Sequence, residues 1–172
     1  MKRSMLFKLV GTMCAAVVVV AALAGCASQE SAATKQQSEN RQYMTQVNQI
    51  MEDLQGKLAS FTDTVSRGDV VGMRTQADNA YKALDDLSKI TVPDDLKDVQ
   101  QEYVDGTGKL KDALNSYIEL YTEIDSATEA QPFDWSTYDQ RIAEIKQTYD
   151  DGIGKLQSGD NKASEKTSAT KS

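Results

Sequence analysis

Apolar residues recur every three or four positions over most of the chain, which is the spacing of one face of an α-helix. Four such stripes follow one another, and no segment alternates apolar and polar residues as a strand does. The stripes are Tyr43, Val47, Ile50, Leu54, Leu58, Phe61 and Val65; Val70, Met73, Ala77, Ala80, Leu84 and Leu87; Leu96, Val99, Tyr103, Leu110, Leu114, Tyr117, Tyr121 and Ile124; and Trp135, Tyr138, Ile142, Ile145, Tyr149 and Leu156. The pattern predicts an all-α fold.

Residues that begin and end helices lie between the stripes. Gly68 suits a left-handed C-terminal cap, and Asp69 suits the N-cap of the next helix. Pro93 suits a first helical turn, and Asp134 suits the N-cap of the last helix. Because short connections favour antiparallel neighbours, we expect an up-down four-helix bundle over residues 38–157. Helices one and three should be longer than helix two. A three-helix bundle with a helical extension is the alternative.

The segments on either side of the predicted bundle lack apolar periodicity. Residues 26–37 are small and polar, and we expect a flexible tether there. Residues 158–172 contain no hydrophobic side chain other than alanine, and we expect a disordered polar tail.

The first 25 residues have a different composition from the rest of the chain. Lys2, Arg3 and Lys8 make the start positive, and residues 9–23 form a mostly apolar run of 15 residues. This run is shorter than the roughly 18 to 20 residues of a membrane-spanning helix. A positive start, an apolar centre and small residues at the end are typical of a secretory signal peptide. A retained membrane anchor is the alternative.

The end of this segment carries a specific motif. Leu23, Ala24, Gly25 and Cys26 resemble the lipobox of bacterial lipoproteins. The resemblance implies a diacylglyceryl group on the Cys26 thiol and cleavage between Gly25 and Cys26. Two acyl chains hold a protein stably on a membrane. The expected location is therefore the extracytoplasmic face of the cell membrane, or the outer membrane if the source has one. The helical part resembles no family of known activity.

Charge and residue inventory exclude several classes of function. Removal of residues 1–25, which carry three basic residues and no acidic one, would take the formal net charge from −7 to −10. Nucleic acid and anionic headgroups repel such a domain, so we expect no nucleic-acid partner. The chain has no histidine, and its other cysteine, Cys14, lies in the segment predicted to be removed. Serine-hydrolase triads, histidine-ligated zinc and cysteine proteases are therefore excluded, and we expect no catalytic residues, metal ligands or cofactor.

A short repeat joins the third and fourth stripes. Residues 103–110, YVDGTGKL, recur as YDDGIGKL at residues 149–156, with six of eight positions identical. A phosphate-binding loop needs a wider glycine spacing, Ser or Thr after the lysine and a preceding strand. Leu110 and Leu156 follow the lysines here, and both copies lie within helical periodicity. We therefore expect the two copies to lie at the same level of an antiparallel bundle, where their glycines would allow close helix approach.

Acidic residues gather near that level of the predicted bundle. They are Asp85, Asp86, Asp94, Asp95, Asp98, Asp105, Asp150 and Asp151. Calcium prefers six to eight oxygen ligands, but no segment has the spacing of a calcium loop, and lysines are interleaved. We expect a solvated face, with a divalent-cation site as the alternative.

Three aromatic residues are candidates for a ligand or partner surface, because Tyr43, Tyr81 and Trp135 lie near helix starts or stripe edges.

The favoured hypothesis is a non-catalytic lipoprotein that contacts another envelope protein or has a structural role in the envelope. The alternative is a lipid-tethered binding module for a cation, a peptide or a glycan.

Overall fold

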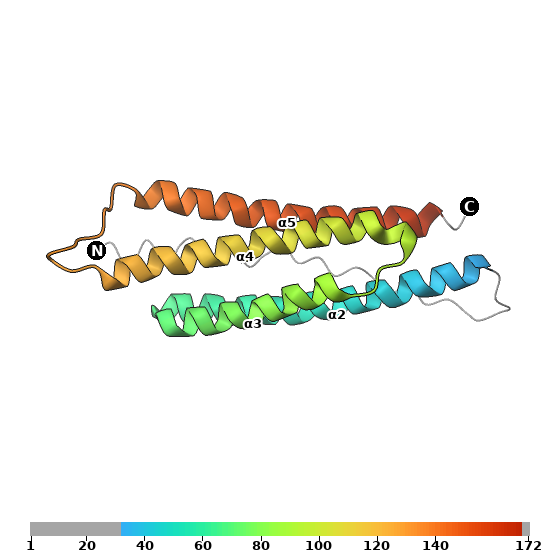
Figure 1. The fold of residues 1–172 in the computed structure, drawn as a ribbon, viewed down its shortest axis with the longest axis horizontal. Helices are drawn as coiled ribbons and strands as arrows, with labels where there is room; N and C mark the ends of the chain where they lie inside the picture. The colour runs from blue at the N-terminus through green and yellow to red at the C-terminus, as the bar shows by residue number, and fades with distance from the viewer. Residues whose placement is uncertain (1–31, 170–172) are drawn as a thin grey trace.

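The computed structural model describes the backbone of residues 32–169 and the side chains of residues 35–166. This part of the chain is an antiparallel bundle of four α-helices, without strands (Figure 1). The predicted all-α fold and antiparallel four-helix bundle are therefore confirmed. The elements are α2 (Ala32–Arg67), α3 (Val70–Lys89), the short 3₁₀-helix η1 (Asp94–Leu96), α4 (Lys97–Ser126) and α5 (Tyr138–Ala169).

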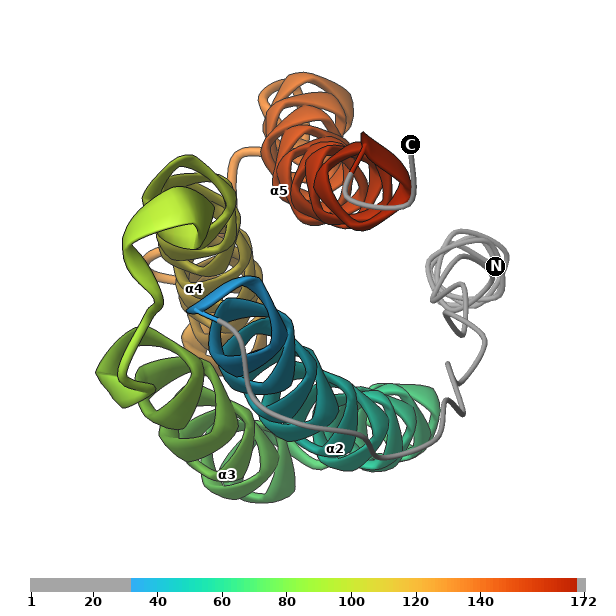
Figure 2. The same cartoon turned by 90° about the vertical axis from the view of Figure 1, so that its right-hand side faces the viewer.

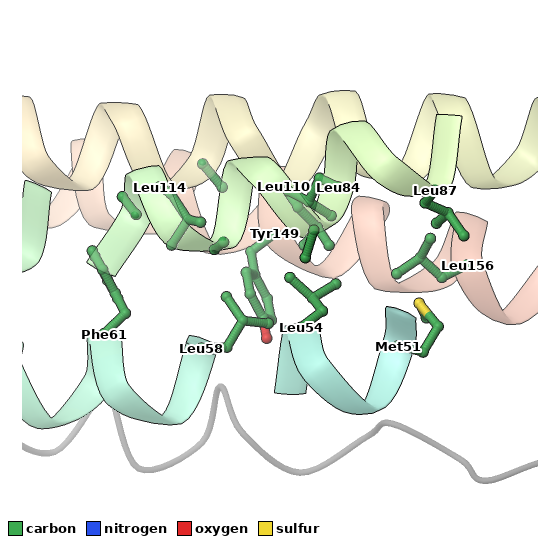
Figure 3. Close-up of a cluster of buried hydrophobic side chains, with 14 of the residues drawn as sticks. Met51, Leu54, Leu58, Phe61, Leu84, Leu87, Leu110, Leu114, Tyr149 and Leu156 are labelled. Atoms are coloured by element: carbon green, nitrogen blue, oxygen red, sulfur yellow. The ribbon is translucent and has the colours of Figure 1, made fainter. Parts of the chain in front are cut away.

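Each helix packs on the next one along the chain: α2 packs on α3, α3 on α4 and α4 on α5 (Figure 2). The predicted stripes, except for Val70 and Trp135, point inward and form one core (Figure 3). Its buried side chains come from all four helices and include Met51, Leu54, Leu58, Leu84, Leu87, Leu110, Leu114, Tyr149 and Leu156. The opposite faces of the helices are polar. No described helix combines the length and the apolar character needed to cross a membrane.

The turn between α2 and α3 is built as the sequence predicts. Gly68 has a φ of 68°, the left-handed conformation that glycine adopts without a Cβ clash. The Asp69 carboxylate accepts a hydrogen bond of 2.8 Å from the backbone N–H of Gly72 and so caps α3.

The start of the last helix differs from the prediction, because α5 begins at Tyr138 and not next to Asp134. The Asp134 carboxylate accepts hydrogen bonds from the backbone N–H and the hydroxyl of Ser136, at 2.9 and 2.7 Å. This local turn uses the side chain that would have capped the helix. The prediction of an Asp134 N-cap is therefore wrong.

Both ends of the domain are more helical than expected. Residues 32–37, predicted as part of the tether, belong to α2, and residues 158–169, predicted as disordered, belong to α5. Polar contacts with α4 explain the long α5. Lys162 pairs with Glu102 at 2.5 Å, Lys166 pairs with Asp98 at 2.6 Å, and Ala163 is buried. The remainders of the predicted tether and tail, residues 26–31 and 170–172, lie outside the described residues.

Helices α4 and α5 come closest where the two copies of the repeat meet. A Cβ atom on Gly106 would lie 2.9 Å from the Gly152 carbonyl oxygen, and one on Gly152 would lie 3.1 Å from the Gly106 carbonyl oxygen. The leucines of the repeat cross over in the same way, with Leu156 against Gly106 and Leu110 against Gly152. The prediction that the two copies lie at the same level is confirmed.

Ion pairs extend this reciprocal arrangement to the surface. Lys109 pairs with Asp151 at 3.3 Å, and Lys155 approaches Asp105 to 3.9 Å. These four residues occupy equivalent positions of the two copies. The repeat therefore packs against itself with local twofold symmetry.

The glycine contact predicts opposite effects for neighbouring glycines. Gly106→Ala or Gly152→Ala should lower the free energy of unfolding, because overpacking costs about 1–3 kcal/mol against a gain of about 1 kcal/mol in helix propensity. Gly108→Ala and Gly154→Ala are matched controls, since open space surrounds both positions. They should raise stability by up to about 1 kcal/mol. Urea denaturation followed by circular dichroism measures all four. Equal effects at the two kinds of position would contradict the close approach.

The end of α5 should contribute measurably to stability. A chain that stops after residue 157 loses the contacts of Lys162, Ala163 and Lys166 with the rest of the bundle. We expect its unfolding free energy to fall by at least about 1 kcal/mol relative to a chain ending at residue 169. The urea midpoints of the two chains provide the comparison. An unchanged midpoint would mean that the last turns of α5 are not docked in solution.

Candidate functional site

The three aromatic candidates do not form one surface. Tyr43 and Tyr81 contact α4 at Gln100 and Asn115, which are 15 residues apart and thus about 22 Å along the helix axis. Trp135 lies in the connection between α4 and α5, at the end where α4 stops. Gly25 and Cys26, the predicted cleavage and lipidation residues, lie outside the described residues.

Tyr43 is a core residue, with 1% of its surface exposed. Its hydroxyl donates to Gln100 Oε1, and Gln100 Nε2 donates to the Leu87 carbonyl oxygen at 3.1 Å. Burial raises the pKa of the Tyr43 hydroxyl well above its usual range. The side chain therefore ties α2 to α4 and α3 and offers no surface to a partner.

Tyr81 is half-buried between α3 and α4. Its hydroxyl donates to Asn115 Oδ1 at 2.7 Å, and the Lys111 ammonium lies 6.0 Å from the centre of its ring. Partial burial and nearby carboxylates raise the pKa of Tyr81 to about 12. The hydroxyl therefore stays neutral at physiological pH and serves as a helix-to-helix contact.

A second buried tyrosine holds the end of α5. The Tyr103 hydroxyl donates to Asp160 Oδ1 at 2.7 Å, and a Cβ on Gly159 would lie 2.7 Å from the Tyr103 ring. Burial raises the pKa of Asp160, although the hydrogen bond from Tyr103 opposes this. The polar sequence of residues 158–172 did not indicate a helix, so Asp160 was not among the predicted site residues. The signal was the small residues Gly159 and Ala163, three and seven positions after Leu156, which continue its helical face.

Polar side chains from α2, η1, α4 and α5 meet at the end of the bundle that we call the Tyr43 end. Gln36 and Asn40 donate to the Asp95 carboxylate at 2.7 and 2.9 Å. Lys166 donates to the Asp95 carbonyl oxygen and to the Asp98 carboxylate. These contacts join the start of α2 to the end of α5 through η1, which is a structural role.

The acidic residues that suggested a cation site are partnered by lysines or amides. The pairs are Asp85–Lys111, Asp86–Lys89, Asp94–Lys97, Asp98–Lys166, Asp105–Lys155, Asp150–Lys146 and Asp151–Lys109, and Asp95 accepts from amide side chains. Among the described residues, no group of three acidic, histidine or cysteine side chains could hold a metal ion. This arrangement is that of a solvated face of paired charges, and it supports no metal-site proposal.

Aromatic side chains collect at the opposite end, which we call the Trp135 end: the α2–α3 turn and the α4–α5 connection at residues 127–137 (Figure 1). Trp135 lies between Phe133 and Tyr138, with ring centroids 5.0 and 5.7 Å apart. Its side chain is 42% exposed. Of the three aromatic candidates, Trp135 alone has an exposed side chain.

A buried aromatic group lies next to these rings. Tyr117 packs edge-on against Phe61 and stacks on Tyr121, with centroids 6.0 and 6.1 Å apart. Burial raises the pKa of Tyr117, and the neighbouring hydroxyls of Tyr121 and Tyr138 add to this effect. The Tyr117 hydroxyl is buried and has no hydrogen-bond partner among the described residues. A buried hydroxyl without a hydrogen-bond partner lowers the stability of the folded state, and the Tyr117 hydroxyl is such a group.

The contact between Tyr103 and Asp160 predicts a pH-dependent gain from Asp160→Asn. The folded state raises the pKa of Asp160, so the wild type loses stability as pH rises from the unfolded-state pKa through the folded one. Asparagine keeps an acceptor for Tyr103 and carries no charge. The variant should therefore be more stable than the wild type at pH 7, and this advantage should shrink below about pH 4. Urea denaturation at pH 7 and pH 3.5 measures the difference. A constant difference at both values would show that the carboxylate is not desolvated.

Comparison of the chain with protein-family models, curated proteins and solved structures found no match. Its function must be inferred from its own residues.

Proposed function

We propose that the protein is a lipoprotein, held through lipidated Cys26 on the extracytoplasmic face of a cell membrane, with a non-catalytic bundle that contacts another envelope protein. The observation that carries the proposal is the motif Leu23-Ala24-Gly25-Cys26 at the end of an apolar segment with a positive start. In a source with an outer membrane, the same anchor can also place the protein on that membrane.

The position of α2 fits this arrangement. It begins at Ala32, six residues after Cys26, and continues for 36 residues. Six residues span at most about 20 Å, whereas 36 helical residues measure about 54 Å. A bundle anchored before α2 would therefore begin close to the lipid and could hold its Trp135 end roughly 50 Å away. A rod of this length can present a surface at a distance from the membrane.

The interior supports a structural role for the buried polar groups. Tyr43 and Gln100 satisfy each other, as do Tyr103 and Asp160, and each pair joins different helices. The chain has no histidine to serve as a general base. We therefore assign no reaction to the bundle.

A lipid-tethered module that binds a peptide is the second candidate. The exposed Trp135, flanked by two further aromatic rings, favours it over a cation module, because the aspartates considered as an alternative cation site are already paired.

The anchor is tested by Cys26→Ala. The variant cannot form the thioether with diacylglyceryl, so we expect no incorporation of labelled palmitate and a precursor that keeps residues 1–25. Mass spectrometry and palmitate labelling of the protein in cells measure both. Cys14→Ala is the matched control, because Cys14 lies inside the predicted signal peptide, and it should be processed and acylated as the wild type. Normal processing and labelling of Cys26→Ala would refute the lipoprotein proposal.

A further inference from the structure

The last turns of α5 are held on α4 in a different way from the rest of the helix. Up to Leu156, large apolar side chains of α5 face the core. Residues 157–172 have no hydrophobic side chain other than alanine, and the buried residues described there are Gly159 and Ala163. Because the free energy of burial scales with the apolar area removed from water, burial contributes little to the docking of this segment.

Ion pairs take the place of large apolar contacts here. Glu102 of α4 pairs with Lys155 at 3.0 Å and with Lys162 at 2.5 Å, and Asp98 pairs with Lys166 at 2.6 Å. The three lysines lie along the side of α5 that borders α4, and their side chains are 34 to 40% exposed. Water and salt therefore reach these pairs. Partly exposed ion pairs contribute modestly to stability, and salt screens them.

The segment covers a buried tyrosine. Tyr103 has no exposed surface, and its hydroxyl donates to Asp160 Oδ1 at 2.7 Å. A Cβ on Gly159 would lie 2.7 Å from the Tyr103 ring, so the backbone of α5 lies directly against the ring. The docked position also disfavours the Asp160 carboxylate, whose pKa is raised by burial. Removal of this segment would expose the ring to solvent.

From these observations we infer that residues 157–169 form a strap that closes over Tyr103 and opens as a unit when salt screens its ion pairs. The part of α5 up to Leu156 stays docked, because large apolar side chains and the contact of Gly106 with Gly152 hold it. Segments with few buried apolar contacts open locally at a lower free energy than the core. Opening changes a closed face of α4 into one that presents an aromatic ring.

The strap lies at the Tyr43 end, beside the start of α2 (Figure 1). Lys166 also donates to the Asp95 carbonyl oxygen, so opening separates α5 from η1 as well as from α4. The inference goes beyond the proposed function and does not depend on it, since it concerns a change of surface within the bundle and neither the anchor nor a partner.

Hydrogen exchange of the full chain, purified in a non-ionic detergent and followed by mass spectrometry, tests the strap. Raising sodium chloride from about 0.1 M to about 1 M shortens the Debye length from about 10 Å to about 3 Å. The amides of residues 157–169 should then exchange about fivefold faster, all by the same factor, because their ion pairs are screened together. The amides of residues 142–155 should keep their rates and serve as the internal reference.

Glu102→Gln should reproduce the effect of salt. The amide keeps the size of the side chain but does not neutralise Lys155 and Lys162, so the strap should exchange faster in about 0.1 M salt and respond less to about 1 M salt. Glu119→Gln removes one charge from an exposed position of the same helix and should leave exchange of the strap unchanged. Equal effects of the two variants, or exchange of the strap that does not depend on salt, would overturn the inference. So would rates that rise gradually toward the end of α5, which indicate fraying.

Nitration by tetranitromethane, with the modified residues located by mass spectrometry, measures whether the strap uncovers Tyr103. Tyr103 should stay unmodified in about 0.1 M salt and react in about 1 M salt. Tyr117 is the control, because it is buried toward the Trp135 end, and it should stay unmodified at both concentrations. Faster exchange of the strap without nitration of Tyr103 would show that the segment does not control access to this ring, and would also overturn the inference.

Discussion

The close approach of α4 and α5 at Gly106 and Gly152 is the contact on which the arrangement of both ends of the bundle depends. Backbone carbonyl groups face each other there with no room for a Cβ atom, and a leucine from each helix covers the glycine of the other. This contact fixes the position of α5 along α4. At the Tyr43 end it places Asp160 under the Tyr103 hydroxyl. At the Trp135 end it places Arg141 opposite Glu123.

The two ends differ in chemistry although they belong to one rod. At the Tyr43 end, carboxylates are paired with lysines or accept from amides, and the tyrosines are buried. At the Trp135 end, arginines pair with carboxylates, Arg67 with Asp63 and Arg141 with Glu123, and the Trp135 side chain is exposed. The first pattern stabilises the fold.

The apolar pattern predicted the fold class, the antiparallel arrangement and the Gly68–Asp69 turn because these depend on periodicity and local capping. It missed residues 158–169, where α5 is held by lysine–carboxylate pairs and small buried residues that hydropathy does not register. Neither could it separate Tyr43 from Trp135. The sequence pattern places both near predicted helix starts, and only the contact of Tyr43 with Gln100 of α4 shows that Tyr43 is buried while Trp135 is exposed.

The glycine contact also has a mechanical consequence. If α5 slid along α4 by one helical turn, about 5.4 Å, a residue with a side chain would replace Gly152 opposite Gly106, and the helices would have to separate. The pair therefore resists shear in the direction of its long axis.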